Sequence, residues 1–193
     1  MYRSIFKGLL CLVFLTQLAT VKAQQGALML YGSLNYRHTN HNGSSFGANP
    51  FGVGYFFNDH IVAGVNYGFD WEKDANKTKI NNHHEAGPFY SDSWRIGDHF
   101  VFIAQADAHY VWGDHMVTSN ANSDYNGYLF RVYPIVSVVL GHGWALKAKF
   151  CELSYESTKD RTGDEIRNNT FVAGVNGSTV GLGVSKNIAL FKK

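Results

Sequence analysis

Acidic residues and histidines lie next to each other at two places where they could support catalysis. Asp107 and His109 are two residues apart, and Asp114 is followed directly by His115. A histidine activates a nucleophile only when a serine or cysteine lies within hydrogen-bond reach. The Gly-x-Ser-x-Gly letters occur at Gly43-Ser44-Ser45-Phe46-Gly47, but no helical pattern follows them, and a nucleophilic serine of this motif needs a strand–turn–helix context. We therefore expect no enzyme.

Histidines also raise the possibility of a metal site. The nine histidines include His38, His41 and the pair His83-His84, which Glu85 follows. Neighbouring histidines in a flexible loop lack the fixed geometry of metal sites. The sequence therefore indicates hydrated polar loops at these positions, with no metal and no cofactor.

A third set of polar residues alternates with apolar or small ones and is expected to line an interior. These residues are Asn66, Asp70, Gln105, Asp107, His109, Arg131, Lys147 and Lys149. Buried charges must pair, because an unpaired one costs several kcal/mol. We expect a network of salt bridges and hydrogen bonds that fills the space. A narrow path for ions or small solutes is the alternative.

The segments that carry these residues have the two-residue period of strands. In 61–71 the odd positions run from Ile61 through Val65 to Trp71, and the even positions are mostly small or polar. In 100–112 the even positions are apolar, whereas Gln105 and His109 lie on the other face. Each strand thus has one apolar face and one mixed face.

Six weaker segments complete a set of eight strands. They are 27–38, 46–57, 87–96, 126–140, 144–156 and about 178–190. The faces of 87–96 stay unassigned. Short turns are predicted at Asn58-Asp59, Gly97-Asp98 and Gly141-His142-Gly143, and longer polar loops at 39–45, 73–85, 113–125 and 157 to about 170 or 177.

The N-terminus has the three-part pattern of a secretory signal peptide. Arg3 and Lys7 precede an apolar run, and cleavage is predicted after Ala23. Residues 24–193 then form one domain with 14 basic and 15 acidic residues, so no basic patch indicates nucleic-acid binding. Only Cys151 remains, which excludes an intrachain disulfide.

Aromatic residues near both ends of the strands favour a membrane barrel, in which they form two interfacial girdles. They are Phe57, Phe100 and Trp144 beside the short turns, and Tyr67, Phe69, Trp71, Tyr110 and Trp112 toward the loops. A soluble periplasmic barrel with aromatics around a ligand cavity is the alternative. The sequence thus predicts an all-β fold, an eight-stranded antiparallel up-and-down transmembrane β-barrel with short periplasmic turns and longer extracellular loops.

Three hairpin motifs resemble those of a known family. The motifs are Asn49-Pro50-Phe51-Gly52-Val53-Gly54-Tyr55-Phe56-Phe57-Asn58-Asp59-His60-Ile61-Val62-Ala63-Gly64, Gly87-Pro88-Phe89-Tyr90, and Tyr133-Pro134 with Gly143-Trp144-Ala145-Leu146-Lys147-Ala148. Together they resemble hairpins of the small outer-membrane β-barrel family common in Bacteroidetes. The resemblance implies residence in the outer membrane of a Gram-negative cell, contact with its lipid, and insertion by the barrel-assembly machinery. The family typically ends in an aromatic residue, whereas here Lys192-Lys193 follow Phe191.

The leading functional expectation is therefore a structural barrel whose external loops are free to bind an extracellular ligand. Loops on a rigid scaffold are where binding usually resides. A narrow pore is the second interpretation. A soluble periplasmic barrel that binds a small ligand and a barrel enzyme are the less favoured interpretations.

Overall fold

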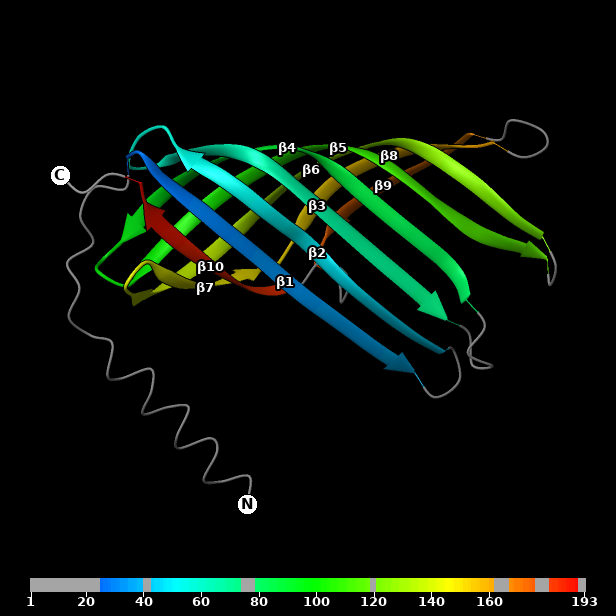
Figure 1. The fold of residues 1–193 in the computed structure, drawn as a ribbon, viewed down its shortest axis with the longest axis horizontal. Helices are drawn as coiled ribbons and strands as arrows, with labels where there is room; N and C mark the ends of the chain where they lie inside the picture. Colours follow the sequence, from blue (N-terminus) through cyan, green and yellow to red (C-terminus); the bar gives the residue numbers. More distant parts are fainter. Residues whose placement is uncertain are drawn as a thin grey trace, which may run out of the picture.

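Ten strand segments form one antiparallel β-barrel in the computed structural model, which describes residues 25–39, 43–73, 79–118, 121–161, 167–175 and 181–190 (Figure 1). The segments are β1 (Ala27–Thr39), β2 (Gly43–Phe56), β3 (Ile61–Lys73), β4 (Lys79–Ile96), β5 (Phe100–Thr118), β6 (Ala121–Gly141), β7 (Trp144–Lys149), β8 (Glu152–Asp160), β9 (Arg167–Gly174) and β10 (Gly181–Ala189). The predicted signal peptide, 1–23, lies outside the described residues.

The described residues contain no helix that is long and apolar enough to cross a membrane.

The ten segments occupy the positions of eight barrel strands. From β1 to β6 each strand pairs with the next, and β6 then pairs with both β7 and β8. β10 pairs with β7, and β9 pairs with β8. Pairing of β1 with β10, which begins at Ala27 and Ala189, closes the barrel. The predicted eight-stranded up-and-down fold is confirmed.

The predicted single strand 144–156 is interrupted by a β-bulge. Two residues of β6 between Val132 and Ile135 face three residues between Lys149 and Leu153. Pro134 lies at this irregularity, and within sheets proline is mostly found at edges and bulges because it cannot donate to the ladder. The extra residue reverses the alternation, because odd positions face inward in β7 and even positions face inward in β8.

A second bulge lies in β2. The three residues between Ala48 and Gly52, which include Pro50, face only two residues of β1 between Tyr31 and Leu34. Neighbouring β3 shows the same extra residue in β2. Both prolines therefore mark places where the ladder shifts register.

Strand faces follow the alternation that the sequence predicts. In β3, Val65 is 62% exposed, whereas its neighbour Asn66 is only 4% exposed. The structure also assigns the faces of β4, where Phe89 and Ser91 point inward and Trp94 points outward. The apolar face thus covers the exterior.

Three tight turns connect strands at one end, at the positions that the sequence indicates. Asn58 Oδ1 accepts hydrogen bonds from the backbone N–H groups of His60 and Ile61. Gly97 has a φ of 67°, and His142 has a φ of 52° between two glycines that are also positive. Glycine adopts positive φ without steric cost, and Asn58 stabilises its turn through its side chain.

The bounds of the predicted long loops are wrong. β4 begins at Lys79, β5 extends to Thr118, and β6 begins at Ala121, so most of 73–85 and 113–125 is strand. Likewise β8 and β9 take up much of the predicted loop after 157. Polar residues can form a hairpin if the two strands satisfy each other's backbone hydrogen-bonding groups. A hydrophilic segment is therefore not necessarily a loop.

Candidate functional site in the barrel interior

A buried ion cluster fills the middle of the barrel. Arg131, on β6, places Nη2 2.8 Å from Glu85 Oε1 on β4 and 3.1 Å from Asp107 Oδ2 on β5. All three side chains are almost fully buried, and Glu85 is only 1% exposed. Two carboxylates thus share one guanidinium nitrogen through charge-assisted hydrogen bonds, which are stronger than neutral ones.

Asp107 is held by further hydrogen bonds that offset its burial. The Tyr133 hydroxyl donates to Asp107 Oδ2 at 2.9 Å, and Gln105 Nε2 donates to Asp107 Oδ1 at 2.9 Å. Gln105 Nε2 also lies 3.2 Å from the Tyr31 hydroxyl, which accepts a hydrogen bond from Asn66 Nδ2 at 2.9 Å. The network therefore crosses the barrel from β6 to β3.

His109 belongs to the same cluster. Its Nδ1 lies 3.2 Å from Arg131 Nη2 and 3.4 Å from Glu85 Oε2. Both His109 and Asp107 thus contact Arg131 in this network.

The two interior lysines of β7 have different surroundings. Lys149 Nζ lies 2.8 Å from Glu152 Oε2, across the bulge that turns both side chains inward. Lys147 Nζ lies 3.2 Å from the sulfur of Met29 and 4.9 Å from the centre of the Tyr31 ring. Lys147 is 8% exposed. The Tyr31 ring thus contacts Lys147, and its hydroxyl group bonds to the polar network.

All eight residues that the sequence assigns to the interior lie on inward positions. Gln105, Asp107, His109 and Arg131 meet directly, and Asn66 joins them through Tyr31. Asp70 is half-buried on the Asn66 face of β3. Lys147 and Lys149 border the network, because their Nζ atoms lie 4.9 Å from the centre of the Tyr31 ring and 5.0 Å from that of Tyr133.

Sequence reasoning missed three members of the network. Glu85 falls in a segment expected to be a loop, although it shares the parity of Phe89 in β4. Tyr31 and Tyr133 share the inward parity of Met29 and Arg131, which could have placed them. Their large rings resemble the outward-facing aromatics, so residue type gave no signal.

The aromatics predicted to lie at two girdles are found on the exterior. Phe57, Tyr67, Trp71, Phe100, Tyr110 and Trp144 are exposed, and Phe69 and Trp112 are partly exposed. Toward the long hairpins, ring contacts link β3, β4, β5 and β6 through Trp71, Phe69, Tyr67, His84, Trp112, Tyr110 and Tyr128. Near the turns, Trp94 lies against Phe102, and Tyr55 lies against Phe57.

The histidine pair is divided by strand geometry. His83 points inward, where its Nδ1 lies 2.8 Å from the Tyr125 hydroxyl. His84 stacks on Trp112 and lies 2.7 Å from the Tyr67 hydroxyl outside. Within the described part of the chain, no three His, Cys, Asp or Glu residues form a group that could hold a metal ion. His41 lies outside that part.

Comparison with solved structures finds the same architecture in the N-terminal β-barrel domain of Pseudomonas aeruginosa OprF, with a TM-score of 0.53. The aligned region covers 85% of this chain and 98% of that domain at 12% sequence identity. The fold is that of an outer-membrane β-barrel domain. No protein-family model and no curated protein matches the sequence. At this identity the likeness establishes the fold alone.

Proposed function

We propose that this protein is a structural barrel of the outer membrane, from the small-barrel family of Bacteroidetes, with an interior plugged by side chains. The observation that carries the proposal is an inside-out distribution of polarity. Large apolar side chains are exposed on the strands, whereas the cluster around Arg131 is buried.

The exterior supports contact with lipid. Soluble monomers rarely expose contiguous apolar patches of more than a few hundred Å². Here exposed apolar side chains occur on neighbouring strands, including Val53 on β2, Val65 on β3, Tyr90 on β4, Val132 on β6 and Leu182 on β10. Because a closed barrel satisfies its backbone groups internally, this surface suits a bilayer.

The interior supports a structural role over a pore. Arg131, Glu85 and Asp107 lie across the lumen, and Gln105 and Tyr31 extend the network toward β3. An eight-stranded barrel is just wide enough to be filled by its own side chains or to hold one small ligand, which leaves no open channel. We therefore expect conductance in planar bilayers to stay near background, and selective solute flux into liposomes would favour the pore instead.

The outer ends of the long hairpins support a role in surface contacts. β5 has 19 residues and β6 has 21, whereas about 9–11 residues suffice to cross the bilayer core. In Figure 1 these strands extend to one end of the molecule, where the β8–β9 hairpin also lies. Their polar ends would stand above the membrane as a rigid surface for an extracellular ligand.

Cell fractionation combined with heat-modifiable gel mobility tests this proposal. The protein, expressed with its own N-terminal segment in a Gram-negative host, should sediment with outer membranes. Its unboiled band should migrate differently from the boiled one, because the folded barrel resists detergent. Recovery as a freely soluble periplasmic protein would contradict the membrane assignment. Mass spectrometry of the mature N-terminus tests cleavage after Ala23.

A further inference from the structure

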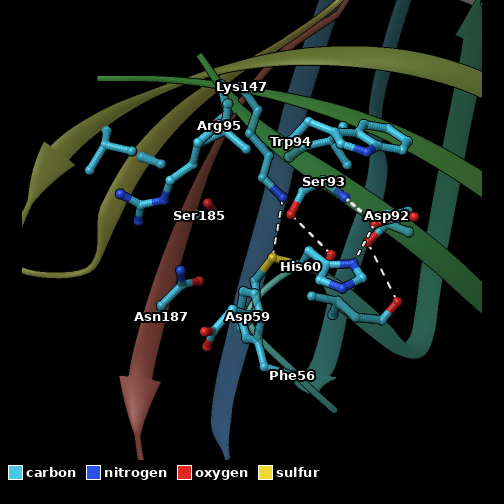
Figure 2. A pocket seen from close by; sticks show the side chains of 18 residues that line it. Phe56, Asp59, His60, Asp92, Ser93, Trp94, Arg95, Lys147, Ser185 and Asn187 are labelled. Carbon is cyan, nitrogen blue, oxygen red and sulfur yellow. Dashed lines mark hydrogen bonds and ion pairs between the residues drawn. The ribbon is translucent and has the colours of Figure 1, made fainter. Parts of the chain in front are cut away.

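The barrel interior holds a cavity of about 670 Å³ on the side of the tight turns. Figure 2 shows the side chains around it. Its mouth includes the exposed residues Asp59, His60 and Arg95 next to the turns, and its inner part includes buried Lys147. A cavity of this size lies within the usual range for small-molecule sites, about 300–1,000 Å³.

Lys147 is the buried cation of this cavity, and no carboxylate lies within 4.0 Å of it among the described residues. Within the described ranges, its Nζ group has the thioether of Met29 as its hydrogen-bond partner and lies over the face of the Tyr31 ring, and both are weak partners for an ammonium group. By contrast, Arg131 contacts two carboxylates and Lys149 contacts Glu152. A buried ammonium without a counter-ion is unfavourable, so an anion at this place would stabilise it.

Hydroxyl groups lie beside the Lys147 side chain. Ser137 pairs with Lys147 in the β6–β7 ladder, and Ser185 pairs with Ala145 in the β7–β10 ladder. Both serines are buried and line the cavity, as does Ser91 from β4. A serine hydroxyl can donate to an anionic oxygen, so Ser137 and Ser185 offer two donors beside one cation.

The mouth adds a second cation and two acids. Arg95 lines the mouth, and no ion pair joins it to another described residue. Asp92 pairs with His60 at 2.8 Å and accepts the backbone N–H of Ser93. Asp59 Oδ1 accepts a 3.4 Å hydrogen bond from the backbone of Gln25. The acids are thus engaged at the rim, and Lys147 dominates the inner end.

We propose that this cavity binds a small organic anion, with its carboxylate or phosphate group on Lys147. The body of the ligand would lie against apolar side chains that line the cavity, namely Met29, Phe56, Val62, Val101, Ile103 and Val139. Binding requires only the folded barrel, whereas supply of the ligand from the periplasm rests on the proposed membrane topology.

NMR titration of the ¹⁵N-labelled barrel in nonionic detergent micelles tests the site. Hexanoate, inorganic phosphate and, as the opposite charge, hexylammonium are added separately. We expect saturable amide shifts at Ser137, Lys147 and Ser185 with hexanoate, with phosphate or with both, and none with hexylammonium. Which anion binds identifies the preferred head group. Equal saturation by hexylammonium, or no saturation by either anion, would overturn the proposal.

Matched lysine variants give the decisive comparison. Lys147→Met should weaken anion binding about tenfold or more, because a charge-assisted hydrogen bond is lost. Lys149→Met removes the other β7 lysine and should leave binding within about twofold. Lys147→Gln serves as a second variant if the methionine variant folds poorly, as judged by heat-modifiable mobility. Unchanged affinity in a folded Lys147 variant would refute the site, even if the barrel is confirmed in the membrane.

Discussion

At the scale of single residues, the interior depends on how two carboxylates share one cation. Glu85 has Arg131 and His109 close to it, whereas Asp107 has Arg131, Gln105 and Tyr133. Hydrogen bonds to a buried carboxylate replace the water that it loses. The buried carboxylates of Glu85 and Asp107 are therefore stable only while these partners are present.

Removal of the shared cation should reveal this dependence. We expect Arg131→Met to destabilise the barrel by about 3–5 kcal/mol, because Glu85 and Asp107 would remain buried without their guanidinium. Urea unfolding in lipid vesicles, followed by tryptophan fluorescence, measures the change.

A combined neutral variant is the control for that experiment. Arg131→Met together with Glu85→Gln and Asp107→Asn removes all three charges, and much of the lost stability should return. If the triple variant were as unstable as the single one, packing rather than charge would explain the effect.

At the scale of elements, close contacts between strands decide where glycine is required. A Cβ at Gly87 in β4 would overlap the carbonyl oxygen of Ala108 in β5. At Gly181 in β10, an added Cβ meets no atom of the described residues within 4 Å. The close approach of β4 to β5 at this point thus depends on the missing side chain.

This contrast gives a paired test. Gly87→Ala should cost about 1–3 kcal/mol, because the strands must separate to accommodate the methyl group. Gly181→Ala should change the unfolding free energy by less than about 0.5 kcal/mol. Parallel urea unfolding of the two variants measures both values. Equal tolerance would mean that β4 and β5 are farther apart than the structure places them.

The bulge between β7 and β8 is the element that arranges the interior of the last strands. It turns both Lys149 and Glu152 inward, and these side chains then pair at 2.8 Å. A regular strand would point one of them outward, since alternation places positions three apart on opposite faces. The bulge therefore keeps both charged side chains off the outer surface of the barrel.

At the scale of the whole molecule, the exterior is what the proposed function depends on. Val65 on β3 and Val132 on β6 are both exposed. If lipid surrounds the barrel, both side chains lie in an apolar medium, and charged substitutions are unfavourable there.

Arginine scanning of the outer face checks this arrangement. Val65→Arg and Val132→Arg should each reduce insertion by about 2–4 kcal/mol, the cost of an arginine near the bilayer midplane. Asp98→Arg, in an exposed turn, is the matched control and should insert normally. After refolding into vesicles, the fraction of protein whose gel mobility changes on heating measures how much has inserted, and this fraction gives the change in the free energy of insertion. Normal insertion of all three variants would argue for a water-facing surface.

The sequence alone determined the strand number, the tight turns and the faces of β3 and β5. These follow from local geometry, because side chains alternate along any strand whatever its neighbours are. For the same reason, the sequence alone assigns Asn66, Gln105 and Arg131 to the interior. The extent of the hairpins could not, since polar strands and polar loops have similar composition.

Only the tertiary structure decided how the interior is divided. The contact of Arg131 with Glu85 joins residues 46 positions apart, and its distance depends on the registers of β4, β5 and β6 together. The parity change between Lys149 and Glu152 likewise depends on one extra residue in a ladder. The register of the strands around Lys147 also determines that its side chain faces a cavity rather than a carboxylate. Contacts across a barrel are set by closure and register, which no local pattern encodes.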